Sequence, residues 1–272
     1  MKALHERVGE AAAYLRDRGV APRAWIILGT GLGGLAERVE GAGTVPYDRI
    51  PNFPRATAPG HAGELLWGAI GDVPVAVMQG RFHYYEGHSL EDVTLPVRVA
   101  RALGARTLFV TSAVGGMDPR LRKGDIVVVE DHLHLMGASP LRGPNDDRMG
   151  PRFPDMSAPY DRALIGRAEE AAGRLGFALP RCVLASVSGP QLETRAEYRW
   201  LRTAGADVVG MSTTPEAIVA AHAGLRTAAF AVVTDLCLPD SLEPVSIESI
   251  VETAAAASPR LADLVSALLP HA

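Results

Sequence analysis

The chain has 272 residues, of which 47% are apolar and 21% charged, so it is long enough to bury a sizeable core. Its formal net charge of −4 and its scattered lysines and arginines offer no basic surface for nucleic acid, so small molecules are the expected partners. No apolar run approaches the roughly 18 residues that span a bilayer, so we expect no membrane association.

Short β-branched runs alternate with alanine- and leucine-rich helical stretches along the whole chain. Strands are predicted over residues 24–28, 65–70, 73–78, 107–112, 125–130, 181–187, 207–209 and 227–234. Helices are predicted over residues 3–18, 90–103, 161–175, 195–204, 215–223 and 247–269. This alternation is typical of an α/β fold whose largely parallel sheet is covered on both faces. We expect one domain over residues 1–272, with the irregular stretch 140–159 as a candidate lid or interface arm.

The two cysteines and the N-terminus indicate a cellular compartment. Cys182 and Cys237 stand alone, without metal-binding spacing or a CxxC pair, and are expected to be small core residues. Isolated thiols fit a reducing cytoplasm better than a disulfide framework. The chain opens on an amphipathic pattern rather than a signal peptide, so a soluble cytoplasmic protein is expected.

A glycine-rich turn at residues 29–34 follows the first predicted strand and matches the dinucleotide-binding pattern GxGxxG. A dinucleotide site also needs a crossover helix of about a dozen residues and a second parallel strand. Gly41 and Gly43 end the helical stretch after residues 35–40, so this sequence disfavours NAD. The backbone amides and the Thr30 hydroxyl can instead approach an anion, with a plain strand-to-helix turn as the alternative.

Residues 80–87 place an arginine, a histidine, two tyrosines and a glutamate on one loop directly after a predicted strand. Arg81 presents a planar fork of donors that suits phosphate or carboxylate, and His83 points the same way if the segment is extended. Core packing does not explain why so many charged and aromatic side chains occur on one short loop. We therefore interpret this loop as an oxyanion clamp rather than as a solvated turn.

Four further motifs lie at or near the ends of predicted strands, at residues 111–116, 188–194, 209–216 and 232–235. Because parallel α/β sheets bind ligands at the carboxyl ends of their strands, these motifs can converge with the first two. Ser212 precedes a helix with Pro215 in its first turn, which favours an anion seat, and an ordinary N-cap is the alternative. Glu193 and Asp235 are expected to read a polar heterocycle or sugar, the alternatives being a helix-start charge and a turn cap.

Together these motifs resemble, in the same order and across nearly the whole chain, those of the trimeric-type purine nucleoside phosphorylases. The matching segments are residues 29–33, 61–63, 80–87, 113–116, 143–148, 152–157, 189–194, 210–216 and 233–235. The resemblance implies an α/β domain with a mixed, mostly parallel and partly barrel-like sheet flanked by helices, assembled as a homotrimer. It also implies a pentosyltransferase of purine salvage that uses inorganic phosphate as co-substrate and needs no cofactor or metal.

The resemblance assigns roles to individual residues of this sequence. The phosphate binders would be Thr30, His61, Arg81, His83, the Ala113 amide and Ser212. The sugar contacts would be Tyr85, Met211, Ile247 and, from a neighbouring subunit, Phe153. The residues around the purine would be Gly115, Leu192, Glu193 and Asp235. The catalytic residues would be His83, Glu193 and Asp235, with Glu86 orienting His83.

The sequence departs from the 6-oxopurine phosphorylases at the position of Asp235, where those enzymes usually have asparagine. A carboxylate accepts a hydrogen bond from a 6-amino group and repels a 6-carbonyl, so adenine nucleosides are favoured. The related methylthioadenosine phosphorylases share this aspartate, and Ile247 and Val251 would suit a 5'-methylthio group unless they are the buried face of the last helix. Glu193 is shared instead with the 6-oxopurine enzymes, and Leu192 replaces an aromatic residue that flanks the base.

We therefore expect a phosphorylase that prefers 6-aminopurines, with adenosine first and methylthioadenosine second. The alternatives within the family are a methylthioadenosine phosphorylase and a 6-oxopurine phosphorylase. The alternatives from other classes are a dinucleotide-dependent oxidoreductase, which would need the turn at residues 29–34 to bind NAD, and a non-catalytic purine-binding protein. A complete phosphate-binding set disfavours the non-catalytic protein, and it also disfavours a hydrolase that uses water.

Overall fold

The computed structural model describes residues 2–57 and 62–272. Its helices are α1 (Leu4–Arg16), α2 (Leu90–Ala102), α3 (Arg162–Arg174), α4 (Arg195–Thr203), α5 (Thr214–Ala223) and α6 (Ile247–Leu268). Its strands are β1 (Ala24–Ile27), β2 (Glu40–Pro46), β3 (Glu64–Ile70), β4 (Val73–Gln79), β5 (Thr107–Gly116), β6 (Ile126–His134), β7 (Arg181–Ser186), β8 (Val208–Gly210) and β9 (Arg226–Leu236). Every helix and strand predicted from the sequence is confirmed, although β5, β6 and β9 run further than expected.

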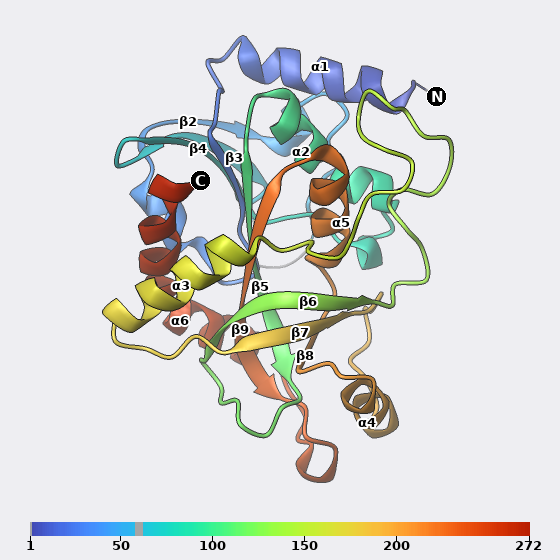
Figure 1. Ribbon diagram of the computed structural model, residues 1–272, viewed down its shortest axis with the longest axis vertical. Coiled ribbons are helices and arrows are strands. Elements are labelled where there is room, and N and C mark those ends of the chain that lie inside the picture. Colours follow the sequence, from blue (N-terminus) through green and yellow to red (C-terminus); the bar gives the residue numbers. More distant parts are fainter. Residues whose placement is uncertain (1, 58–61) are drawn as a thin grey trace.

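The described strands form one sheet in the order β2-β3-β4-β1-β5-β8-β7-β6-β9, and β9 pairs back with β5. Strands β5, β8, β7, β6 and β9 therefore close into a five-stranded barrel, and the other four extend from β5 as an open sheet (Figure 1). Strand β5 joins the two parts, because residues 107–110 pair with β1 and residues 115–116 pair with β8. Five pairings of described strands are parallel and four are antiparallel, so the sheet is mixed.

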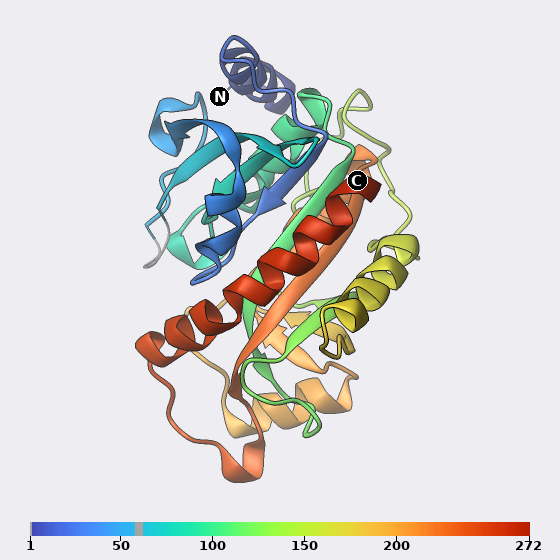
Figure 2. The same cartoon turned by 90° about the vertical axis from the view of Figure 1, so that its left-hand side faces the viewer.

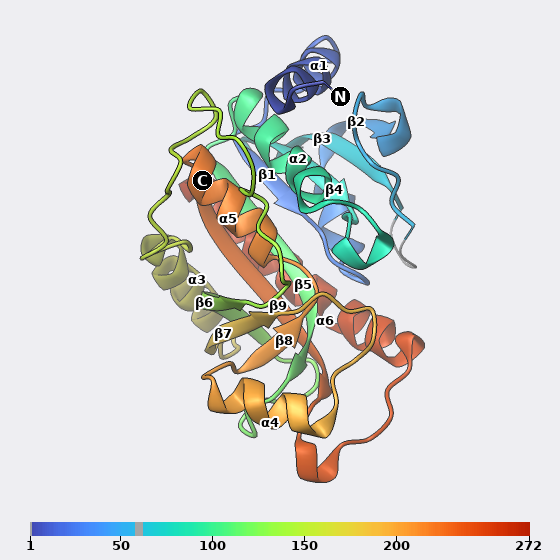
Figure 3. The same cartoon turned by 90° about the vertical axis from the view of Figure 1, so that its right-hand side faces the viewer.

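Helices cover the sheet from both sides. Helices α3 and α6 pack together on one side (Figure 2), and α2 and α5 pack together on the other (Figure 3). Strand β1 is buried along its whole length, as expected for an apolar strand between two helical layers. In α6 the buried Leu261, Leu264 and Leu268 recur at helical spacing and form the face that packs on the sheet. Within the described ranges, no helix is both long and apolar enough to cross a membrane.

Strand β2 was not predicted. Its sequence EGAGTVP contains two glycines and one proline and few β-branched residues, so it carries little strand signal. The stretch expected to be helical is a short 3-10 helix, Gly33–Arg38, and β2 then pairs antiparallel with β3. In the described residues between the glycine-rich turn and β3, the crossover helix and parallel strand that a dinucleotide-binding unit requires are therefore absent.

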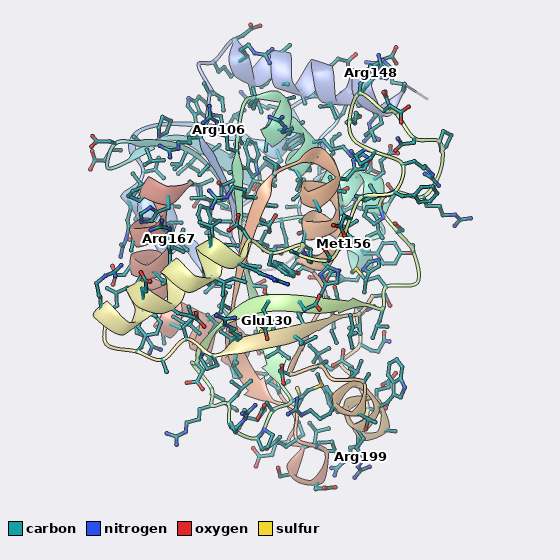
Figure 4. The ribbon with its side chains drawn as sticks, in the orientation of Figure 1. Arg106, Glu130, Arg148, Met156, Arg167 and Arg199 are labelled. Carbon is teal, nitrogen blue, oxygen red and sulfur yellow. The ribbon has the colours of Figure 1, made fainter. Side chains whose placement is uncertain are left out.

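The segment between β6 and α3, residues 135–161, forms no helix or strand in the structure. It lies along two helices on the outside of the fold. His5 Nδ1 in α1 is 3.2 Å from Asp146 Oδ2, and His222 Nε2 in α5 is 3.3 Å from Asn145 Oδ1. Figure 4 shows Arg148 of this segment beside α1.

Candidate active site

A cavity of about 320 Å³ opens where the carboxyl ends of β1, β4, β5, β7, β8 and β9 meet the first turn of α6. Ligands of α/β sheets bind at this end of the strands, and the volume suits a small molecule. The predicted site residues that line it are Thr30, Arg81, His83, Tyr85, Ala113, Gly115, Leu192, Glu193, Met211, Ser212, Asp235 and Ile247. The other lining residues are Gly29, Ser112, Val114, Pro190, Tyr198, Val209, Gly210, Thr234, Cys237 and Ile250.

Two predicted residues are not among the lining residues. His61 lies outside the described part of the chain. Phe153 is 87% exposed in the segment between β6 and α3, beside a separate hollow that includes His132 and Arg152. Phe153 therefore does not line this cavity.

The turn after β1 brings Thr30 to the cavity because it passes very close to β5. A Cβ atom on Gly29 would lie 2.8 Å from both Ser112 Cα and the Thr111 carbonyl oxygen, so only glycine fits. The Gly29 amide donates to Thr111 Oγ1 at 3.1 Å and fixes this approach. Close packing against β5 therefore explains why the first residue of the GxGxxG pattern is glycine.

The loop after β4 is anchored by the side chain of Phe82. Phe82 is buried and packs edge-on against Tyr47 at 5.1 Å and against Phe53 at 6.1 Å between ring centroids. The Tyr47 hydroxyl donates to the Gly80 carbonyl at 2.9 Å. With Phe82 held inward, the neighbouring Arg81 and His83 reach the cavity, so the crowded loop is part of the cavity wall and not a solvated turn.

Arg81 is almost completely buried. Its Nη1 lies 3.3 Å from Glu216 Oε1 and donates to Thr213 Oγ1 at 3.5 Å, and its Nη2 donates to the Thr111 carbonyl oxygen. Burial lowers the pKa of Arg81, and the Glu216 carboxylate opposes that effect. The guanidinium is thus a charged group fixed from two directions at the edge of the cavity.

His83 is held by Glu86, as predicted. The Glu86 Oε1 atom lies 2.9 Å from His83 Nδ1 and accepts from the His83 amide at 2.8 Å, and the Thr57 amide donates to Oε2 at 2.7 Å. Burial alone would raise the pKa of Glu86, but the hydrogen bonds from His83 and Thr57 lower it to about 2. The ring of Tyr85 stacks on His83 at 4.6 Å between centroids. Both rings therefore face the cavity in one fixed arrangement.

Ser212 lies in the turn between β8 and α5. The N-cap position of α5 belongs to Thr213, which has a φ of 76°, so the interpretation of Ser212 as an ordinary N-cap is wrong. The Ser212 carbonyl accepts from Ser186 Oγ at 3.1 Å and from the Thr214 amide at 2.9 Å. Positive φ is strained for a β-branched residue and marks a turn that its surroundings hold in place.

Asp235 is the tenth residue of β9, not a helix or turn cap as the alternative interpretation required. Thr234 Oγ1 donates to its Oδ1 at 2.9 Å, and Cys237 Sγ donates to its Oδ2 at 3.2 Å. Glu193, the second carboxyl group in the cavity, is half-buried rather than exposed. Burial raises the pKa of Glu193, the carboxylates of Glu197 and Asp235 raise it further, and a hydrogen bond with Tyr198 opposes them.

Tyr198 and Cys237 line the cavity but were not predicted as site residues. Cys182 is a buried core residue as expected, whereas Cys237 is buried and also contacts Asp235. The signal for Cys237 was its position two residues after Asp235, since alternate residues of an extended chain share a face. Nothing in the sequence distinguishes Tyr198 from an ordinary buried residue of an amphipathic helix.

The structure changes the expectation of which α6 residues line the cavity. Ile247 is 56% exposed and lines the cavity, so it does not belong to the buried face of the helix. The second residue of α6 in the cavity wall is Ile250, and Val251 is not part of that wall. The apolar contribution of this helix therefore comes from Ile247 and Ile250.

The cavity combines two chemically different groups of side chains. Arg81, His83 and Ser212 offer a cation and hydrogen-bond donors, and Glu193 and Asp235 offer carboxyl groups. Across residues 2–57 and 62–272, no cluster of three or more histidine, cysteine, aspartate or glutamate side chains is arranged to hold a metal ion.

Comparison with known proteins identifies the class. Residues 23–270 match the family model of the Phosphorylase superfamily. The chain is 44% identical over 250 residues to purine nucleoside phosphorylase 1 of Bacillus subtilis, covering 92% of each chain. It is 45% identical over 255 residues to purine nucleoside phosphorylase of Bos taurus, covering 91% of this chain and 88% of the other.

Solved structures of similar fold are also purine nucleoside phosphorylases. Purine nucleoside phosphorylase of Schistosoma mansoni in complex with adenosine has a TM-score of 0.91 to this structure, with 39% identity over 96% of this chain and 95% of the other. A schistosome purine nucleoside phosphorylase in complex with hypoxanthine has a TM-score of 0.92, with 38% identity over 97% of this chain and 96% of the other. The chain belongs to the purine nucleoside phosphorylase family of this superfamily.

Proposed function

We propose that this enzyme uses inorganic phosphate to cleave the N-glycosidic bond of purine ribonucleosides and 2'-deoxyribonucleosides, reversibly, as part of purine salvage in the cytoplasm. The products are the free base and (deoxy)ribose 1-phosphate. One observation carries the proposal. Arg81 contacts the carbonyl of Thr111 in β5, and Asp235 pairs with Gly115, four residues further along that strand. Four residues of a strand span about 13 Å. Phosphate, pentose and purine fit in a row over that length.

Phosphate is proposed to bind at the first of these positions. Its ligands would be Thr30, Arg81, His83, the Ala113 amide and Ser212, with His61 as a further ligand. A buried guanidinium is a strong partner for a phosphate dianion, because the planar fork donates two parallel hydrogen bonds. Glu86 supports this role of His83, since a carboxylate on Nδ1 fixes the orientation of the ring.

The sugar is proposed to lie between phosphate and base, against Tyr85, Met211 and Ile247. Phosphate below the anomeric carbon would attack as the glycosidic bond breaks, and its negative charge would offset the oxocarbenium-like charge of the sugar. The protein then needs no nucleophile of its own. In a homotrimer, Phe153 of a neighbouring subunit would complete this site, which the 87% exposure of its side chain supports.

The purine is proposed to lie beside Gly115, Leu192, Glu193 and Asp235. The departing base gains negative charge, and a hydrogen bond to N7 would stabilise it. Asp235 is proposed to supply that bond, which it can do only while it holds a proton in the ligated site. Asp235→Ala tests this role, because the variant should lose most turnover while the fold persists, and full turnover would contradict it.

The proposed substrate preference is for 6-aminopurines, with adenosine first and methylthioadenosine second. The preference is assigned to Asp235, because its two oxygens accept hydrogen bonds from Thr234 and Cys237. A hydrogen-bond acceptor suits a 6-amino group. The exposed Ile247 at the cavity wall supports some tolerance for an apolar 5'-substituent.

The deciding experiment measures turnover of adenosine, methylthioadenosine, inosine and guanosine by the purified enzyme, with and without phosphate. We expect phosphate-dependent release of the base and fastest cleavage of adenosine. Faster cleavage of inosine or guanosine would contradict the preference but not the phosphorylase activity. Cleavage that continues without phosphate would indicate a hydrolase, and no cleavage of any of the four nucleosides would contradict the proposal itself.

A further inference from the structure

The Cys237 thiol is a buried group in the cavity wall that the proposed reaction does not use. It is 1% exposed, and its Sγ atom donates to Oδ2 of Asp235 at 3.2 Å. Cys237 follows the last residue of β9, so both side chains come from one short stretch of backbone. The contact therefore joins the thiol directly to the carboxyl group proposed to face the purine.

Gly115 in β5 makes room for this pair. A Cβ atom on Gly115 would lie 2.4 Å from Cys237 Sγ and 3.4 Å from Asp235 Oδ2. The first distance is shorter than any stable contact, so the thiol occupies space that only glycine leaves open. Strand β5 thereby fixes where the sulfur atom lies relative to the carboxylate.

The two oxygens of Asp235 each have one neutral donor. The Thr234 hydroxyl donates to Oδ1 at 2.9 Å and also lies 3.3 Å from the Val114 carbonyl, which ties it to β5. Cys237 is the matching donor on Oδ2. A carboxylate with one donor on each oxygen is held in one rotamer, and the remaining lone pairs keep a fixed direction.

The direction of the hydrogen bond from Cys237 follows from its surroundings. Burial raises the pKa of the Cys237 thiol well above its ordinary value, and the Asp235 carboxylate raises it further, so sulfur keeps its proton and donates. Tyr198 interacts electrostatically with both the thiol and Glu193. Cys237 therefore lies between Tyr198 of α4 and Asp235 of β9.

We propose that Cys237 is a positioning residue that holds Asp235 as a hydrogen-bond acceptor and thereby sets the discrimination between 6-amino- and 6-oxopurine nucleosides. This inference rests on the proposed function. Without the thiol donor, the carboxyl group is free to rotate, so the proton that it holds in the ligated site can turn towards a 6-carbonyl and its acceptor oxygen no longer keeps a fixed direction towards a 6-amino group. Loss of the donor therefore weakens selectivity more than it weakens catalysis in general.

The test compares the ratio of kcat/KM for adenosine to kcat/KM for inosine in matched variants. Cys237→Val and Cys237→Ala remove the donor, with and without filling the volume, and should lower the ratio about fivefold or more. Cys237→Ser keeps a donor and should keep the ratio within about twofold. Cys182→Ala removes the other buried thiol, which lies outside the cavity, and should leave the ratio unchanged.

The readout separates this inference from the proposed function. If the wild-type enzyme cleaves neither nucleoside, the proposed function is wrong. If it cleaves both and the ratio of Cys237→Ala or Cys237→Val stays within twofold of wild type, the inference about Cys237 is overturned. A serine variant that loses as much selectivity as the alanine variant also overturns it, because the donor would then be irrelevant. Two variants without the thiol donor are used, so that the experiment still gives a result if one of them fails to fold.

Discussion

Arg81 and Glu216 form an ion pair inside the cavity wall, with 3.3 Å between Nη1 and Oε1 and 2% exposure of each side chain. Glu216 lies in the first turn of α5, whereas Arg81 lies in the loop after β4. The pair therefore joins two elements that are distant in sequence, and it fixes the guanidinium at the proposed phosphate site. Buried charges tolerate the loss of one partner poorly, because the other is left without compensation.

Glu216→Ala should therefore destabilise the protein by about 3–5 kcal/mol in urea denaturation. Glu216→Gln retains the shape and a hydrogen-bond acceptor, so it should lower the free energy of unfolding by less than Glu216→Ala does. The matched control is Asp240→Asn, which changes the exposed pair of Asp240 with Arg199, 2.6 Å apart. Figure 4 shows Arg199 on the outside of the molecule. We expect little or no change there, since exposed ion pairs contribute little. Equal effects at the two sites would show that burial of the Arg81 pair has no energetic consequence.

Arg81→Lys should raise the KM for phosphate about tenfold or more and change the KM for adenosine much less. The variant keeps the positive charge but loses the planar fork, and the loss of one charge-assisted hydrogen bond is enough for a tenfold change. Initial rates at varied phosphate and saturating adenosine measure it. Arg199→Lys on the surface of α4 is the control. A phosphate KM equal to that of wild type would remove Arg81 from the phosphate site.

Much of this molecule could be predicted from its sequence, for a physical reason that is visible in β1 and β9. Buried strands are apolar on both faces and end abruptly in polar or glycine-rich turns, so the pattern shows both the strand and the position of the site. Thr30 follows the end of β1, and Asp235 lies near the end of β9. Each was identified by its place at the carboxyl end of an apolar run, and the cavity contains both.

The features that were missed depend on long-range contacts. Strand β2 is held by its pairing with β3 and carries little strand signal of its own. In α4, Tyr198 is buried whereas Trp200 is 58% exposed, and no local pattern says which of the two aromatic residues faces a cavity. The barrel closes through the pairing of β5 with β9, more than 100 residues apart in sequence, and its expectation came from the family resemblance alone.

Glu86→Gln should remove a pH-dependent part of the stability. The pKa of Glu86 is about 2 in the folded protein and 4.5 is its ordinary value, so the folded state binds the proton less tightly than the unfolded state. The carboxylate therefore stabilises the fold fully above about pH 5, and this contribution is lost as the pH falls from 4.5 towards 2.

Urea denaturation at several pH values checks this expectation. The stability difference between wild type and Glu86→Gln should be on the order of 2–3 kcal/mol at pH 6 and should shrink as the pH falls towards 3. Glu243→Gln, at an exposed glutamate in the loop before α6, is the control and should give a difference that does not vary in this way. A difference for Glu86→Gln that is the same at pH 6 and pH 3 would contradict the hydrogen bonds with His83 and Thr57 as its source.

Asp235→Asn should reverse the substrate preference towards 6-oxopurines. The side-chain amide has nearly the same shape, but its NH₂ group donates hydrogen bonds, so it suits a 6-carbonyl and can reach N7 without a captured proton. A hydrogen-bond acceptor in the site strongly disfavours a base that presents a second acceptor to it, because a buried polar group is then left unpaired. We expect the ratio of kcat/KM for adenosine to that for inosine to fall about tenfold or more.

The same assays with Asp240→Asn, at an exposed aspartate away from the cavity, control for the change of charge. The inference about Cys237 adds a further condition to this experiment. In the Asp235→Asn background the thiol has no carboxylate to hold, so Cys237→Ala should no longer change the ratio. A ratio that stays at the wild-type value in Asp235→Asn would show that purine selection depends on other groups, with Glu193 as the first candidate because it is the second carboxyl group in the same cavity.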